Sequence, residues 1–207
     1  QPGDCAMVFG KRAFFGYLAS PTDEIWWFAN PPSKRELTRA ELVDLGQHGW
    51  KEHLTALFAN DRSPAVDILN ATGGPLSYTN SYDMPAVPRW FNERAIIIGD
   101  AAHAASPSSG QGASLAIEDA VVLAKCLRDC PSPRDAFATF EHLRRERVEK
   151  IVAAGAKTAA YKAPNRIGRF MRDLMMPMFL KRQSSGGDES MESVFRYHID
   201  WNAPARA

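Results

Sequence analysis

Three short stretches near the start of the chain are rich in apolar residues and have the length of β-strands. They cover residues 6–9, 12–19 and 24–30, and the turn-forming pairs and clusters GK and SPTD separate them. This spacing predicts an antiparallel meander. The last two strands carry six aromatic residues on both faces: Phe14, Phe15, Tyr17, Trp26, Trp27 and Phe28. These aromatic side chains either fill a core on both faces or line a pocket on one of them.

After Pro31 and Pro32 the apolar spacing becomes helical. Thr38 and Glu41 stand at the spacing of a capping box, which predicts the start of a helix. The predicted helices cover residues 38–47, 49–58, 64–70, 113–127, 134–161 and 165–181, the last one interrupted or ended near Pro177. A return strand is predicted at 75–84, and a short final helix or strand at 192–201.

The middle of the chain, residues 95–127, combines a predicted strand, an irregular connection and a predicted helix. Residues 95–98 form an apolar, β-branched run closed by Gly99, which predicts a buried strand that delivers Asp100 to its carboxyl end. Residues 101–109 are small and irregular, and a Gly-Gln-Gly sequence then opens the helix predicted at 113–127. That helix is apolar on most faces, so we expect it to be buried, and its Glu118 and Asp119 suit the positive end of the helix dipole.

A strand, a carboxylate, a glycine-rich approach and a helix N-terminus together favour the binding of a large polar cofactor. Amides at a helix start stabilise negative charge, and glycines let a ligand approach the backbone. The alternative is that these glycines serve only close packing.

The sequence IIIGDAAH, followed by P-x-x-G-Q-G and AIEDAVVLA, resembles the second FAD-binding motif of the single-component flavoprotein monooxygenases, the aromatic hydroxylase group. Many members have asparagine at the position of Ser114. The GQGAS form is more similar to the branch that contains urate and salicylate hydroxylases and carotenoid epoxidases. The resemblance implies an α/β fold, or α+β for a fragment, in which part of a doubly wound FAD-binding domain joins an antiparallel β-sheet substrate domain.

The resemblance also implies roles for individual residues. Asp100 would hold the ribityl hydroxyls, Pro107 would lie beside the flavin, and the start of the helix would present amides to the pyrimidine edge. The implied cofactor-binding residues are Gly99, Asp100, Pro107, Gly110, Gln111, Gly112, Ala113 and Ser114. Arg12 and Phe14 share a strand face and are candidate substrate residues, although Arg12 at a strand start can equally face solvent. No general base is identified.

The implied division of the chain is a substrate-domain sheet at 1–90, the second half of the FAD-binding domain at 91–183 and a tail at 184–207. The implied activity is hydroxylation or epoxidation of an aromatic or polyene small molecule, with NAD(P)H as reductant and O₂ as oxidant. Two alternatives stay open: another flavoprotein of the same fold, such as a halogenase or reductase, and a non-catalytic binding module. The basic cluster Arg144, Arg145 and Arg147 alternates with glutamates, which predicts a solvated, ion-paired face. In the family, one arginine of this helix can instead approach the cofactor phosphates.

Composition excludes several classes of partner. A formal charge of +1 gives no electrostatic case for a nucleic-acid partner, and no apolar run is long enough for a membrane span. Three cysteines without a C-x-x-C pair suit a reducing compartment, so cytoplasm is expected. His48 and His53 lack neighbours at ligand spacing, so no metal site is predicted.

The G-x-G-x-x-G motif that would hold the FAD pyrophosphate does not occur in the 207 residues. We therefore expect a carboxyl-terminal portion of a flavoprotein that is inactive by itself, retains no bound FAD and self-associates through exposed apolar surface.

Overall fold

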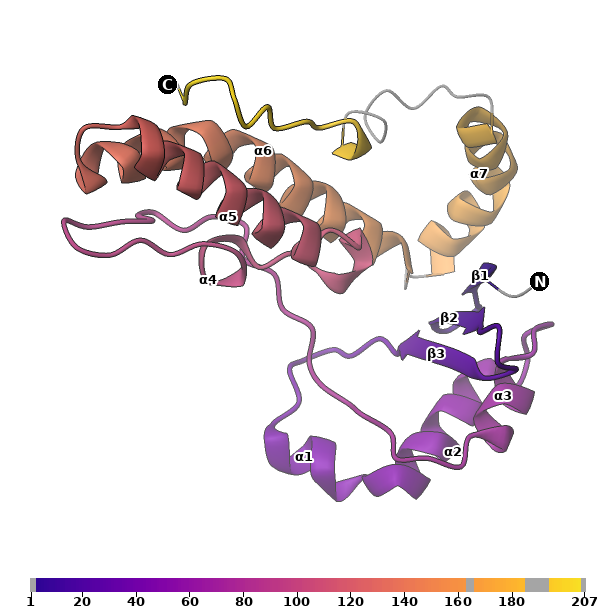
Figure 1. Cartoon of the computed structure of the whole chain (residues 1–207). Helices are drawn as coiled ribbons and strands as arrows, with labels where there is room; N and C mark the ends of the chain where they lie inside the picture. The colour runs from indigo at the N-terminus through magenta and orange to yellow at the C-terminus, as the bar shows by residue number, and fades with distance from the viewer. Residues whose placement is uncertain (1–2, 163–165, 185–193, 206–207) are drawn as a thin grey trace. The chain divides into compact units, whose positions relative to one another are not determined.

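The structure is a computed structural model that describes residues 3–162, 166–184 and 194–205 (Figure 1). The chain divides into two compact units. One consists of Gln1–Asn80 with Ala160–Asp173, and the other of Ser81–Ala159 with Leu174–Ala207. The predicted functional division at residues 90 and 183 stays a prediction.

The first unit contains an antiparallel sheet in the order β1-β2-β3, formed by β1 (Cys5–Phe9), β2 (Phe14–Ala19) and β3 (Ile25–Asn30). The three predicted strands are thereby confirmed. Three helices follow: α1 (Arg39–Asp44), α2 (Gly46–Phe58) and α3 (Ala65–Ala71). The predicted capping box is also present, because Thr38 Oγ1 accepts from the amide of Glu41 while Glu41 Oε2 accepts from the amide of Thr38.

One face of this sheet packs against α2 and α3, which lie on the same side of it (Figure 1). Phe15 is fully buried there, with its ring stacked on Trp27 at 5.4 Å and edge-on to Phe58 at 5.3 Å between centroids. The opposite face carries Phe9, Phe14 and Phe28. The sequence left open whether the aromatic side chains fill a core or line a pocket. On the face that packs against α2 and α3, they fill a core.

The second unit contains α4 (Asp100–His103), the 3₁₀ turn η1 (Pro107–Ser109), α5 (Gly112–Asp129) and most of α6 (Pro133–Lys162). The last helix, α7 (Arg166–Ser184), begins in the first unit and ends in the second. Helices α5 and α6 lie side by side (Figure 1) and share an apolar cluster. The predicted mixed class of helices with an antiparallel sheet is confirmed, and all strand pairing among the described residues is antiparallel.

Two predicted strands differ from the structure. Residues 75–84 form no strand, because their backbone hydrogen bonds to other segments are isolated, such as that from Met84 N to Ala104 O at 2.8 Å. Residues 95–98 form no strand and join no ladder. Asn92 Oδ1 accepts from the amides of Arg94 and Ala95, and this turn folds the segment back so that only Phe91 and Ile96 form a bridge.

Three helical expectations also need correction. Only one face of α5 is buried, since Ile117 and Leu127 are 67% and 50% exposed. Helix α7 is neither interrupted nor ended at Pro177 but continues to Ser184. The predicted final element lies partly outside the described residues; 194–196 form a single turn, and 197–200 have no regular structure.

Candidate functional site

Gly99 begins the candidate site with a backbone that only glycine adopts easily. Its φ of 59° and ψ of −141° turn the chain sharply from the apolar segment into α4. A Cβ atom at this position would lie 3.3 Å from the Cβ of Ala116 on α5. The Gly99 amide donates to Asp119 Oδ2 at 2.9 Å. The turn is therefore held against α5 by both close packing and a buried hydrogen bond.

This turn brings the carboxylate of Asp100 to the start of α5. Asp100 is exposed, and a Cβ atom added at Gly112 would lie 3.8 Å from Asp100 Oδ1. No side-chain hydrogen bond caps the N-terminus of α5, so its first amides can donate to a ligand. An acceptor carboxylate and a row of amide donors thus lie next to each other, with glycine between them.

Local hydrogen bonds hold the loop between α4 and α5, and most of the predicted cofactor-binding residues around it stay exposed. Ser106 caps η1 by accepting from the amide of Ser108, and Gly110 follows in the left-handed conformation at φ 64°. The Gln111 amide donates to Ser109 Oγ at 3.2 Å. Most of the predicted cofactor-binding residues are exposed here: Asp100, Pro107, Gly110, Ala113 and Ser114. Gly99 is buried, and Gln111 and Gly112 are half-buried.

Behind this surface lies a buried polar network centred on Asp119, whose side chain is fully buried. Its Oδ2 accepts from the Gly99 amide and, at 2.6 Å, from His103 Nε2. Its Oδ1 accepts from Arg144 Nε at 2.8 Å. Burial alone would raise the pKa of Asp119, but the hydrogen bonds from His103, Gly99 and Arg144 outweigh it and hold that pKa below its ordinary value. The network therefore holds an ionised carboxylate directly behind the Gly99 turn.

Arg144 connects this carboxylate to a second one. Its guanidinium also pairs with Glu118 at 2.7 Å, and Arg147 binds Glu118 through two hydrogen bonds of 2.8 and 2.9 Å. Burial of Glu118 is again outweighed, by its bonds to Arg147 and Arg144, so its pKa is lowered. The predicted ion pairing of the basic cluster is confirmed, but its solvated face is wrong for Arg144, which is fully buried. Glu118 and Asp119 also lie beyond the first turn of α5, so they act as partners of arginines and not on the helix dipole.

Sequence reasoning missed this network, although the spacing carried a signal. Asp119 shares its helix face with Leu115, Val122 and Cys126, all buried. Arg144 falls in phase with another buried set on α6: Phe137, Phe140, Val148 and Ile151. One charged residue at an apolar position in each of two long helices indicates a buried pair between them.

The two predicted substrate residues have different surroundings. Arg12 is exposed, and its Nη1 donates to the carbonyl of Ala56 on α2 at 3.2 Å. Phe14 is fully buried on the opposite sheet face, where its ring contacts those of Phe9 and Phe28. The structure thus does not bring Arg12 onto the face that Phe14 occupies.

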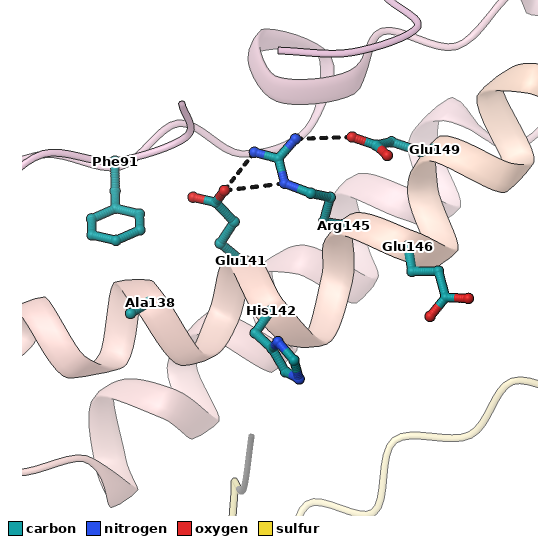
Figure 2. A pocket seen from close by; sticks show the side chains of 7 residues that line it. All are labelled: Phe91, Ala138, Glu141, His142, Arg145, Glu146 and Glu149. Atoms are coloured by element: carbon teal, nitrogen blue, oxygen red, sulfur yellow. Dashed lines mark hydrogen bonds and ion pairs between the residues drawn. The ribbon is translucent and has the colours of Figure 1, made fainter. Parts of the chain in front are cut away.

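A surface pocket of about 540 Å³ lies along α6 (Figure 2). Its lining residues are Phe91, Ala138, Glu141, His142, Arg145, Glu146 and Glu149. Arg145 is bound to both Glu141 and Glu149, as Figure 2 shows, so the cation in this pocket is already neutralised. None of the predicted cofactor or substrate residues lines it.

The described residues include no group of three His, Cys, Asp or Glu side chains arranged to hold a metal ion. Within the same ranges, no helix has the length and apolar character needed to cross a membrane. Cys5, Cys126 and Cys130 are free, and burial raises the pKa of the Cys126 thiol to about 11.

Several known proteins are similar to this chain in sequence or in fold. Residues 51–155 match the family described as FAD binding domain. The 2-heptyl-3-hydroxy-4(1H)-quinolone synthase of Pseudomonas aeruginosa is 41% identical over 146 residues, which span 70% of this chain and 37% of that enzyme. The aurachin C monooxygenase/isomerase of Stigmatella aurantiaca is 31% identical over 150 residues, spanning 70% of this chain and 36% of that enzyme. Among solved structures, Klebsiella pneumoniae HpxO complexed with FAD and uric acid superposes with a TM-score of 0.71 at 19% identity, covering 92% of this chain and 48% of HpxO.

The fold is therefore similar to that of the matching half of HpxO. The chain belongs to the FAD binding domain family, and the relatives that it resembles include a monooxygenase/isomerase. It spans about a third of the length of these curated relatives and about half of HpxO.

Proposed function

We propose that this chain forms the flavin-ring part of an FAD-dependent monooxygenase that hydroxylates or epoxidises an aromatic or polyene small molecule. The observation that carries the proposal is the exposed carboxylate of Asp100 beside the uncapped N-terminus of α5, with Gly112 leaving the space between them free. Carboxylate acceptors suit the hydroxyls of a ribityl chain, and helix amides suit the carbonyl oxygens of a flavin ring.

In this proposal the bound flavin supplies the redox chemistry, with NAD(P)H as reductant and O₂ as oxidant. The residues of the chain bind and orient the flavin. Asp100 accepts hydrogen bonds from the ribityl hydroxyls, while the amides of Gly112, Ala113 and Ser114 donate to the ring edge. Pro107 and Gly110 shape the loop that borders the ring. The free cysteines support a reducing compartment such as the cytoplasm.

The test is equilibrium binding of FAD to the 207-residue chain, followed by flavin fluorescence up to millimolar concentration. Asp100→Ala should lower the affinity by about tenfold to a hundredfold, because charge-assisted hydrogen bonds contribute roughly 1.5 to 3 kcal/mol. Glu93→Ala removes an exposed carboxylate of the same unit and should leave the affinity unchanged. Equal binding of FAD by the parent chain and by Asp100→Ala would overturn the proposal.

A further inference from the structure

Residues 194–205 lie along α5 and α6 in the same compact unit, although only their first residues form a helical turn (Figure 1). Near the start of this segment, Arg147 Nη2 donates to the carbonyl of Val194 at 3.1 Å. Near its end, Arg128 Nη1 donates to the carbonyl of Trp201 at 2.7 Å, and the guanidinium carbon of Arg128 lies 4.6 Å from the Trp201 ring centroid. Apolar side chains along the segment pack against the core cluster of α5 and α6: Val194, Ile199 and Ala205. We call this segment the strap, because both helices hold it.

Tyr197 of the strap lies against two arginines of the buried ion-pair network. The guanidinium carbon of Arg147 is 3.8 Å from the centroid of its ring, and that of Arg144 is 5.6 Å from it. The Arg147 side chain is only 16% exposed, and that of Arg144 is fully buried. An aromatic face attracts a cation more strongly where water is excluded. The ring therefore helps to stabilise two cations that have lost most of their hydration. One of them, Arg144, has a buried Nη1 without a hydrogen-bond partner among the described residues.

Arg147 connects the strap to the rest of the network through one carboxylate. It donates to both oxygens of Glu118, at 2.8 and 2.9 Å. The Glu118 side chain is 17% exposed, and its Oε2 also pairs with Arg144 at 2.7 Å. Arg144 in turn pairs with Asp119 at 2.8 Å. Because these four side chains are largely buried, water and salt screen their charges poorly. A shift of Arg147 therefore acts on the whole series of ion pairs.

We propose that Tyr197 is a positioning residue of the flavin site, which acts through this ion-pair network on the turn at Gly99. Asp119 Oδ2 accepts from the Gly99 amide at 2.9 Å, and Asp100 follows directly in the chain. The ring of Tyr197 fixes the arginine end of the network, so that Asp119 keeps the orientation in which it holds the turn. The consequence for FAD rests on the proposed function, but the effect on the Gly99 turn does not. A strap that served only the stability of the unit would not act on this turn selectively.

The first test is amide hydrogen exchange, measured by NMR on the 207-residue chain without FAD. Tyr197→Leu removes the ring and should speed exchange of the Gly99 amide by about tenfold, the size of a lost cation–π contact between desolvated groups. Tyr197→Phe keeps the ring and should leave that exchange as in the parent chain. The Ile97 amide donates to the carbonyl of Trp90, outside the network, and should exchange at the parent rate in every variant. Phe195→Leu removes a 68% exposed ring of the same strap and is the matched control.

Circular dichroism checks that each variant is folded, and Tyr197→Met replaces Tyr197→Leu if the latter unfolds. Equal exchange at Gly99 in Tyr197→Leu and in the parent chain would overturn the inference. Equal acceleration at Gly99 and Ile97 would overturn it as well, because the strap would then act on the stability of the whole unit.

The FAD affinity of the same variants tests the second step. Tyr197→Leu should lower it by about threefold to tenfold, but much less when Asp100→Ala is also present. Selective acceleration at Gly99, with an FAD affinity that does not respond to Asp100→Ala, would leave this contact series standing while the proposed function fails. An FAD affinity that falls in Asp100→Ala but not in Tyr197→Leu would reject the role of Tyr197 in the flavin site alone.

Discussion

At the scale of single residues, the candidate site depends on two neighbours with opposite demands. Gly99 must be small and must adopt a positive φ, whereas Asp100 must be charged and exposed. The first requirement comes from packing against Ala116, and the second from the ligand that the site would hold. A substitution at Gly99 should therefore act on the fold, and one at Asp100 on binding.

Gly99→Ala should lower the free energy of unfolding by about 1 to 3 kcal/mol, the cost of holding a residue with a Cβ atom in this backbone region. The close approach of Ala116 adds to that strain. Urea unfolding followed by circular dichroism measures the effect. Gly73→Ala is the matched control, because no atom lies within 4 Å of its added Cβ. Equal stability of both variants would contradict the structural reading of Gly99.

At the scale of elements, the sequence pattern correctly predicted features that depend on residues close together in the chain. The three strands and the capping box at Thr38 follow from alternation and from side-chain bonds within one turn. Segment 95–98 was predicted as a strand from its apolar run. Such a run does not reveal whether a partner strand is present, and here only Ile96 forms a bridge. Asp119 and Arg144 were assigned to the helix dipole and to solvent for a similar reason, since their pairing joins residues 25 positions apart. The exposed residues of the candidate site were predicted from the resemblance to the FAD-binding motif. The buried network behind them was identified only from the structure.

Asp119→Asn keeps the shape of this buried side chain but removes the charge that faces Arg144. We expect the free energy of unfolding at pH 7 to fall by about 3 kcal/mol, because the buried cation of Arg144 loses one of its two carboxylate partners and keeps only Glu118. The pKa of Asp119 is lower in the folded chain than its ordinary 3.8. Its contribution is therefore present above that value and is lost as the pH falls through the folded-state pKa. Urea unfolding at pH values from about 2 to 7 measures this loss. Towards acid, the free energy of unfolding should fall less steeply for the variant than for the parent chain, which is a flatter acid limb of the stability curve.

Glu24→Gln, at an exposed carboxylate just before β3, should reproduce the stability and the acid limb of the parent chain. A double-mutant cycle separates positioning from general damage. If Asp119 acts on the flavin through the Gly99 turn, Asp119→Asn should weaken FAD binding much less in the Asp100→Ala background than in the parent chain. Additive losses would mean that the network supports stability without placing Asp100.

At the scale of the whole molecule, the chain passes between its two units at residues 80–81, within α6 and within α7. Both helices are continuous across these boundaries. Helix α7 differs from α5 and α6 because none of its described apolar side chains, which end at Met178, joins either buried core cluster. Ile167, Phe170, Leu174 and Met178 follow one another at helical spacing and are 77%, 68%, 65% and 68% exposed. Such a stripe is more apolar surface than a monomer usually leaves in water.

We propose that this α7 stripe pairs with the same stripe of a second copy, because a single apolar helix face is self-complementary about a two-fold axis. Sedimentation velocity over a concentration series should show a monomer–dimer equilibrium for the parent chain. Leu174→Lys places a charge at the centre of the stripe and should shift the chain to monomer without loss of helical circular dichroism. Ile117→Lys makes the same kind of change at a 67% exposed apolar position on α5 and should leave the dimer intact. A parent chain that stays monomeric throughout the series, or a dimer that only Ile117→Lys disrupts, would rule out pairing through α7.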